Sequence, residues 1–162
     1  MGILICGLNG AGKTTLGKEL ARRLGWRFLD SEALFFESRL SREEAVRALE
    51  ELVSADRNFV FASVTGDYGD TVLSCIDLIA VLQVPREERL RRVKERSRAR
   101  YGARMAPGGD LYERERRFFE MVAARDEGHV TRWLERVRCP IVYIDGTLPT
   151  ESEIDIVLKN IK

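Results

Sequence analysis

The sequence predicts an α/β protein in which one five-stranded parallel sheet is covered by helices on both faces. Short apolar runs alternate with longer segments of helical periodicity along the 162 residues. The runs contain few polar residues, as is typical of strands buried on both faces of a parallel sheet. A glycine-rich segment joins the first run to the first helical segment. We therefore expect three layers, with a binding site at the carboxyl ends of the strands.

Five apolar runs supply the expected strands. Each run is short, and the fourth is rich in β-branched residues, which favour strands. Alternation with helices predicts that the strands pair in parallel, because each helix returns the chain to the start of the next strand. In chain order the expected strands are residues 2–6, 26–29, 59–63, 78–84 and 140–144.

Six segments carry helical spacing or helix-end signals. Leu16 and Leu20 recur at helical spacing, and Gly25 is a typical end for that helix. Ser41 begins a capping box, and Pro85 suits a helix start because its missing N–H is not needed there. The expected helices are residues 13–24, 31–37, 41–56, 85–100, 111–138 and 149–161. A turn over residues 65–70 and a loop over residues 101–110 complete the chain.

Composition limits the classes of function. Apolar residues make up 44% and charged residues 33%, with a net charge of +1, which indicates a globular protein and no general polyanion binder. His129 is the only histidine and the three cysteines are scattered, which argues against structural zinc and favours free thiols in the cytoplasm. No run is long enough for a signal peptide or membrane span. We expect one cytoplasmic domain over residues 1–162.

Residues 7–14, here called the phosphate loop, read Gly-Leu-Asn-Gly-Ala-Gly-Lys-Thr and match G-x-x-x-x-G-K-[ST] at every required position. Glycines let the backbone approach phosphate oxygens, and the N–H groups at the following helix start favour an anion. Lysine reaches the β- and γ-phosphates, and the threonine hydroxyl is a Mg²⁺ ligand. The absence of an Asn-Lys-x-Asp guanine motif favours ATP. The sequence therefore predicts ATP and Mg²⁺ bound at Gly7, Asn9, Gly10, Ala11, Gly12, Lys13, Thr14 and Thr15.

This loop, the five strands and a basic helix after the fourth strand resemble the small nucleoside-monophosphate-kinase-like family, which includes adenylate, shikimate and gluconate kinases. The resemblance covers the whole chain in outline, and the phosphate loop is its most specific part. It implies the three-layer P-loop NTPase fold with a short lid at about residues 97–112. It also implies a kinase that transfers the γ-phosphoryl group of Mg·ATP to a hydroxyl or phosphate acceptor.

Two acids follow the second expected strand. Residues 26–32, Trp-Arg-Phe-Leu-Asp-Ser-Glu, resemble the second strand of shikimate and gluconate kinases, which ends in Asp-x-Asp. The resemblance implies that Asp30 lies on the magnesium side and that Glu32, in place of the family's second Asp, meets the acceptor. A carboxylate after an apolar strand also suits a Mg²⁺ site. The alternative is that Asp30 only caps the next helix.

The turn after the third strand should face the same cleft as the phosphate loop, because parallel strands end at one edge. Asp67 and Asp70 in this turn are candidates for acceptor contact or for a general base, although Asp also simply favours turns. The turn has neither the triple glycine of shikimate kinases nor the Asp-Gly-Phe-Pro-Arg of adenylate kinases. The acceptor therefore stays open.

Residues 86–104 carry nine Lys or Arg against three Glu, which is typical of an anion site or of a solvated helix face. Residues 85–96 resemble the segment that opens the lid of adenylate kinases. That likeness implies that Arg92 stacks on adenine and Arg96 reaches the phosphates. The two are four residues apart and share a helix face, and the planar guanidinium suits both tasks. The sequence leaves open which of five other arginines contact ligand: Arg100, Arg104, Arg114, Arg117 and Arg125.

The segment Asp-Gly-Thr-Leu-Pro over residues 145–149 resembles the loop that holds adenine in this family, which implies a nucleotide contact at Thr147. Residues 31–56 carry seven acids against three Arg. This charge favours an acceptor without a phosphate, or one with a cationic group. The candidate catalytic residues are Lys13, Asp30, Glu32 and Arg96.

Two function classes remain. The first is a small-molecule kinase, acting as a monomer or homodimer. The second is a nucleotide-dependent switch or accessory ATPase without a small-molecule acceptor, since P-loops serve both. The compact size and the lid favour transfer. The basic block is too local for the extended stripe that nucleic-acid binding needs.

Overall fold

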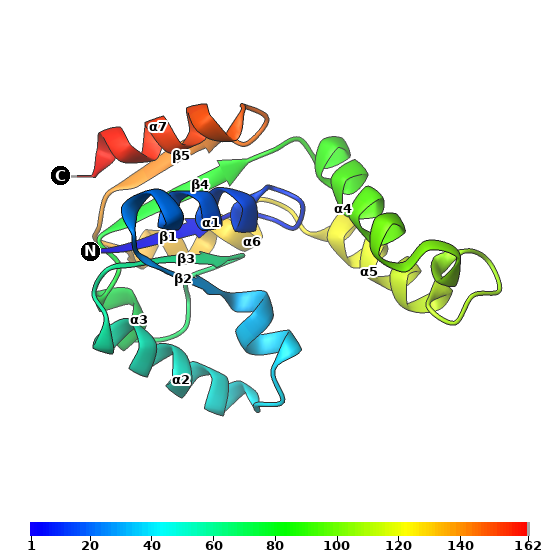
Figure 1. Cartoon of the computed structure of the whole chain (residues 1–162), viewed down its shortest axis with the longest axis horizontal. Coiled ribbons are helices and arrows are strands. Elements are labelled where there is room, and N and C mark those ends of the chain that lie inside the picture. Colours follow the sequence, from blue (N-terminus) through cyan, green and yellow to red (C-terminus); the bar gives the residue numbers. More distant parts are fainter. Residues whose placement is uncertain (162) are drawn as a thin grey trace.

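The computed structural model describes residues 1–161 and has a five-stranded parallel sheet at its centre (Figure 1). The strand order is β2-β3-β1-β4-β5, and every neighbouring pair is parallel. All the strands therefore end at one edge of the sheet. The strands are β1 (Gly2–Cys6), β2 (Arg27–Asp30), β3 (Phe59–Ser63), β4 (Leu78–Gln83) and β5 (Ile141–Asp145).

Helices cover both faces of the sheet, as the sequence predicted (Figure 1). Alternate side chains of β1 explain the two layers: Ile3 and Ile5 join the core on one face, and Leu4 and Cys6 join the core on the other. The first face carries α1 (Lys13–Leu24) and α7 (Thr150–Asn160). The second face carries α2 (Arg42–Ala55), α3 (Asp70–Ser74), α6 (Gly128–Thr131) and the 3-10 helix η3 (Arg132–Arg136).

Several local signals act as the sequence predicted. The Glu44 backbone N–H donates to the Ser41 hydroxyl at 3.2 Å, and the Ser41 N–H donates to the Glu44 carboxylate at 2.7 Å, which completes the capping box of α2. Gly25 ends α1 with φ 67°. The short helix expected after β2 is a π-helix, η1 (Ala33–Glu37), and the one-turn helix α3 was not predicted.

Two helices project from the body as a pair: α4 (Arg86–Tyr101) and α5 (Tyr112–Ala124) (Figure 1). We call residues 86–124 the arm. The predicted lid, residues 97–112, is the outer end of this arm, and the expected loop over residues 101–110 contains a 3-10 helix, η2 (Gly102–Met105). None of the helices in residues 1–161 has the length and apolar character needed to cross a membrane.

The single helix predicted over residues 111–138 is wrong. Helix α5 ends at Ala124, and α6 starts at Gly128 after a turn in which the His129 N–H donates to the Asp126 carboxylate at 3.2 Å. The break turns the chain from the arm back onto the sheet. It lets three apolar side chains pack in the core of the second face: Val130, Trp133 and Leu134.

Candidate functional site

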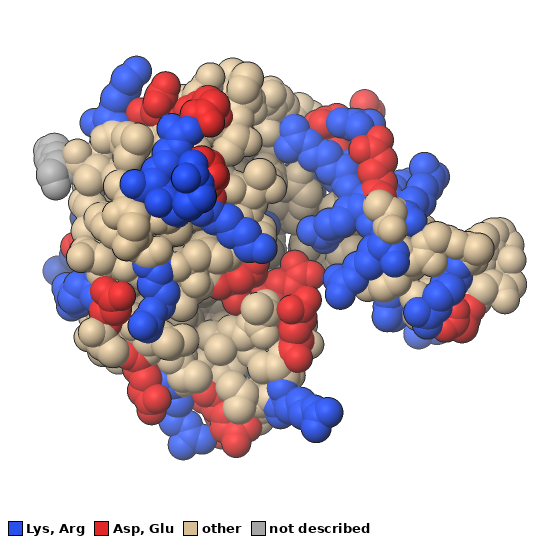
Figure 2. All heavy atoms as spheres, in the orientation of Figure 1, with Lys and Arg blue, Asp and Glu red and all other residues tan. Residues whose placement is uncertain are grey.

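A pocket of about 1350 Å³ opens at the carboxyl edge of the sheet. Figure 2 shows the hollow between the body and the arm, with Lys and Arg gathered on the arm side and acidic side chains on the opposite rim. Its walls come from the phosphate loop, the ends of β2 and β3, the arm, the segment around α6 and η3, and the start of α7. Seven Lys or Arg and four Asp or Glu line it. The pocket is thus large and net cationic, as a site for a polyphosphate requires.

The phosphate loop is shaped by glycine and mounted against the arm. Gly10 has φ 85°, and a Cβ atom there would lie 2.5 Å from the carbonyl oxygen of Arg89. Gly12 has φ 101° directly before α1. Side chains would strain both positions, so the glycines are needed for conformation and for close packing. Of the predicted nucleotide-binding residues, Gly7 is buried behind the loop, and residues 9–15 line the pocket.

Lys13 lies on the pocket floor, where its Nζ donates to the carbonyl oxygen of Leu8 at 3.2 Å. The pKa of Lys13 is lowered from 10.5 to about 8, mainly by burial, and the nearby charge of Arg96 acts in the same direction. The carboxylates of Asp30 and Glu32 act in the opposite direction. A cation this poorly solvated gains much from an anionic ligand.

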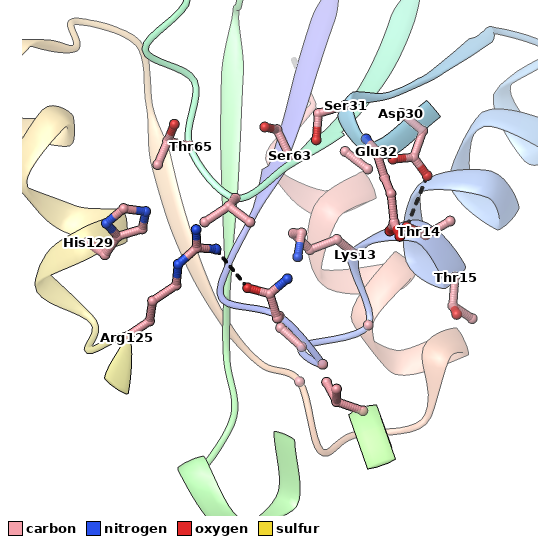
Figure 3. A pocket seen from close by; sticks show the side chains of 18 of the residues that line it. Lys13, Thr14, Thr15, Asp30, Ser31, Glu32, Ser63, Thr65, Arg125 and His129 are labelled. Carbon is pink, nitrogen blue, oxygen red and sulfur yellow. Dashed lines mark hydrogen bonds between the residues drawn. The ribbon is translucent and has the colours of Figure 1, made fainter. Parts of the chain in front are cut away.

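Thr14 and Asp30 come together beside Lys13 (Figure 3). The Thr14 hydroxyl donates to Asp30 Oδ2 at 3.1 Å, while Asp30 Oδ1 accepts from the Glu32 N–H at 2.9 Å. Asp30 therefore both caps the turn after β2 and faces the phosphate loop, so the two interpretations of this residue are compatible. Glu32 is exposed and lines the same pocket.

These oxygens fit Mg²⁺. A hydroxyl and a carboxylate are hard ligands, and Mg²⁺ in nucleotide sites is held by one or two protein groups together with phosphates and water. Within residues 1–161 no three His, Cys, Asp or Glu side chains gather as a cage for a metal ion. This sparse set suits a metal that arrives with a nucleotide better than a permanently bound one.

Arg92 and Arg96 both line the pocket from α4. Arg92 donates through Nη1 to the Gly146 carbonyl oxygen at 3.0 Å and through Nε to Glu88 at 2.8 Å. It thereby ties the arm to the loop after β5. Arg96 lies one turn further out, is exposed, and has no hydrogen-bond or ion-pair partner among residues 1–161. Its guanidinium group is available to a ligand.

Two arginines hold Asn9 of the phosphate loop. Arg125, directly after the arm, donates through Nη1 to Asn9 Oδ1 at 2.9 Å (Figure 3). Arg89, near the start of the arm, is 4% exposed and donates to the carbonyl oxygens of Val84 and Asn9 at 3.2 and 3.4 Å. Sequence reasoning missed Arg89, because nothing separates it from its basic neighbours except its position four residues after Pro85.

The remaining basic candidates lie outside the pocket. Arg104 pairs with Asp110 at 2.6 Å at the tip of the arm. Arg100 and Arg114 both lie over the Tyr101 ring, at 5.4 and 4.7 Å from its centroid. Arg117 is exposed on α5 and does not line the pocket. Of the five arginines left open by the sequence, only Arg125 lines it.

In the loop after β5, the two neighbours of Thr147 face the pocket, and Thr147 itself does not. The backbone N–H and hydroxyl of Thr147 donate to Asp145 at 2.9 and 2.6 Å, and these bonds hold the pKa of Asp145 below its usual value. Gly146 and Leu148 line the pocket, whereas Thr147 does not. Thr147 therefore shapes the loop through its own turn.

The half of the pocket beyond Lys13 and Asp30 contains charged residues that lie far from these two in the sequence, so the sequence did not indicate that they meet here. Arg136 of η3 forms an ion pair with Asp67, and Arg42 and Arg132 line the same region. Arg132 and Arg136 add positive charge that the count over residues 31–56 does not include, so the charge of that segment does not describe the pocket. Asp70 begins α3 and lies outside the pocket, which separates it from Asp67.

Aromatic side chains form part of the same wall. The Tyr68 hydroxyl lies 2.8 Å from the buried Ser63 hydroxyl, and the Tyr68 ring stacks on Phe35 at 4.8 Å between centroids. Trp133 of η3 is buried against the turn after β3 and also lines the pocket. This half has both the volume and the mixed polarity for a second ligand beside a nucleotide.

The chain is similar to a known family and to known proteins over more than half of its length. The AAA domain family model matches residues 3–119. The uncharacterised protein YqaC of Bacillus subtilis is 26% identical over 96% of this chain and 94% of its own length. A shikimate kinase of Thermosynechococcus vestitus is 34% identical over 113 residues, which span 58% of this chain and 62% of that protein.

Solved structures show the same architecture. A deoxyadenosine kinase from M. mycoides with bound dCTP superposes with a TM-score of 0.60 at 18% identity, covering 99% of this chain and 98% of that one. A shikimate kinase from Aquifex aeolicus gives 0.55 at 19% identity, covering 99% and 95%. The fold expected from the family resemblance is confirmed. The chain belongs to the AAA domain family and has the fold of the small P-loop kinases.

Proposed function

We propose that this protein is a small-molecule kinase that transfers the γ-phosphoryl group of Mg·ATP to a hydroxyl or phosphate oxygen of its acceptor. The observation that carries the proposal is the meeting of Lys13, the Thr14–Asp30 pair and the unpartnered Arg96 in one pocket. The pocket continues past them into a second half with its own polar wall. The matched deoxyadenosine and shikimate kinases support the same class of reaction.

Each residue has a definite task in this reaction. The phosphate loop and Lys13 bind the β- and γ-phosphates, and Thr14 and Asp30 hold Mg²⁺, which neutralises phosphate charge when it is bound. Arg96 stabilises the charge of the transferring group. Glu32 accepts the acceptor's proton and orients its oxygen, a task that falls to Asp30 only where Asp30 does not hold the metal. The new bond joins that oxygen to the γ-phosphorus, the bond to the β–γ bridging oxygen breaks, and ADP leaves with that electron pair.

The test is ADP release from Mg·ATP, measured with and without a panel of metabolites that carry hydroxyl or phosphate groups. Products are identified by mass. We expect one chemical class of acceptor to stimulate ADP release and to gain the mass of a phosphoryl group. Slow hydrolysis that no acceptor changes would favour the switch or accessory ATPase instead.

Arg96 provides a prediction with a matched control on the same helix. Arg96→Ala should lower kcat about 100-fold or more, with a smaller effect on the acceptor KM, because the guanidinium acts mainly on transition-state charge. Arg98 is exposed on α4 and lies outside the pocket, so Arg98→Ala should keep normal kinetics. Equal effects of the two changes in steady-state assays would assign the loss to the helix and not to the pocket.

Substitutions of Asp67 and Asp70 distinguish a role in acceptor binding from a role in forming the turn. Asp67→Asn loses the charge that orients Arg136, so the acceptor KM should rise about tenfold. Asp70→Asn should leave KM unchanged, because Asp70 does not line the pocket. The measurement is an acceptor titration at saturating Mg·ATP. A larger change for Asp70→Asn would refute this assignment of the two acids.

A further inference from the structure

Glu153 is a buried acid that the proposed reaction does not use. It lies in the first turn of α7, is only 5% exposed, and lines the pocket together with Gly146, Leu148 and Thr150. Among residues 1–161 its carboxylate accepts no hydrogen bond and joins no ion pair. Burial raises the pKa of Glu153 to about 6, so the group is still largely ionised at neutral pH.

Among residues 1–161 the fully buried side-chain atom without a partner is Trp133 Nε1, so the Glu153 oxygens keep some contact with solvent in the pocket. A partly desolvated carboxylate still gains from a donor that replaces this water. The contrast with the chain's other buried acid is informative: Glu115, equally buried, accepts from Arg114 at 2.9 Å. Arg92 is the nearby cation that favours the ionised form of Glu153, but its own hydrogen bonds go to Glu88 and Gly146. Glu153 therefore keeps unused acceptor capacity that faces the pocket.

The place of Glu153 indicates which part of a ligand it meets. Gly146 packs against the phosphate loop so closely that a Cβ atom there would lie 3.0 Å from the Ala11 carbonyl oxygen. The loop after β5 and the first turn of α7 thus form the wall next to the phosphate loop, on the side away from Asp67 and Arg136. Asp30, beside which Mg²⁺ and the terminal phosphates would lie, ends β2, and β2 and β5 are at opposite edges of the sheet. The base and ribose of a nucleotide whose phosphates lie on Lys13 would therefore extend to the wall beside β5. This step rests on the proposed function.

We propose that the Glu153 carboxylate accepts a hydrogen bond from an N–H group of the purine base of the phosphoryl donor and so determines which nucleotide is used. Adenine offers its 6-amino group, and guanine offers N1–H and its 2-amino group. A base without such a donor leaves the carboxylate buried and unpaired. Discrimination of this kind is strong, because an unmet buried charge costs more than a lost contact.

The experiment varies the Glu153 side chain and the amino group of the base independently. Dissociation constants are measured by calorimetry for the full chain and for Glu153→Met, which keeps volume and removes the acceptor. The ligands are the magnesium complexes of ATP, GTP and purine riboside 5′-triphosphate, which lacks the amino group. We expect the unchanged protein to bind ATP, or GTP if guanine is the base read, about tenfold more tightly than purine riboside triphosphate. Glu153→Met should bind all three alike.

Glu151 is the matched control, because it lies in the same turn, is exposed, and pairs with Arg23 outside the pocket. Glu151→Met should keep the preference. Retention of the full preference by Glu153→Met would overturn the proposal. So would a preference for ATP over 2′-deoxy-ATP that Glu153→Met abolishes, since the ribose would then be the group that Glu153 recognises. Failure of every triphosphate to bind the unchanged protein would instead overturn the proposed function itself.

Discussion

Replacing Lys13 by Met is expected to abolish phosphoryl transfer while making the protein more stable. Product formation should fall about 1,000-fold or more, because Lys13, the one lysine among residues 1–161 that lines the pocket, no longer meets the β- and γ-phosphates. Stability should rise, because the same lysine is held as a poorly solvated cation. Its pKa of about 8, against 10.5 in the open, corresponds to a cost of about 3 kcal/mol at most. The lost bond to Leu8 offsets part of this gain.

The pH dependence of the free energy of unfolding tests the sign of this stability change. A lowered pKa means that the unfolded chain holds this proton more tightly than the folded protein, so stability increases as pH rises from about 8 to 10.5. In Lys13→Met that rise should be absent. Urea unfolding at several pH values measures it, beside Lys18→Met as a control for an exposed lysine on the same helix. Lower stability of Lys13→Met at pH 7 would contradict the account of a strained cation.

Asp30→Asn is expected to lower kcat about 100-fold or more and to raise the Mg²⁺ concentration needed for half-maximal activity about tenfold. The amide oxygen can still accept from the Glu32 N–H, so the turn after β2 should keep its shape. What is lost is the negative charge opposite the Thr14 hydroxyl. The change therefore separates metal binding from folding.

The measurements are a Mg²⁺ titration of activity at fixed ATP and a thermal melt. Asp155→Asn is a suitable control, since Asp155 is exposed on α7 and outside the pocket. An unchanged Mg²⁺ requirement together with reduced kcat would assign Asp30 to the acceptor and not to the metal. A large fall in melting temperature would show that its cap to Glu32 dominates.

The parts of the fold that were predictable are those decided by local pattern. The strands β1, β3 and β4 are continuous apolar runs, and the phosphate loop and the capping box at Ser41 are local motifs. Lys13, Thr14 and Asp30 follow from the same logic, because each lies within a few residues of a strand end. Their convergence is a direct result of parallel pairing between β1, β3 and β2.

The far half of the pocket was not predictable in this way. The helix predicted over residues 111–138 is interrupted at residues 125–127, between α5 and α6. Only this interruption brings Arg132, Trp133 and Arg136 to the pocket. The break is driven by burial of apolar side chains under the sheet, a long-range effect that outweighs local helix propensity. Asp126 and Gly128 were the available local signal, since Asp often caps a helix and glycine weakens one.

The contacts at Asn9 attach the base of the arm to the phosphate loop, so any rotation of the arm would have its axis there. Arg89 near the start of the arm and Arg125 directly after its end both donate to Asn9, so the base of the arm is held at two points. A rotation of the arm about this base would displace the Arg104–Asp110 pair at the tip more than Arg96, and Arg96 more than Arg92, because displacement grows with distance from the axis. Such a rotation would change the mouth of the pocket and leave its floor, with Lys13, in place.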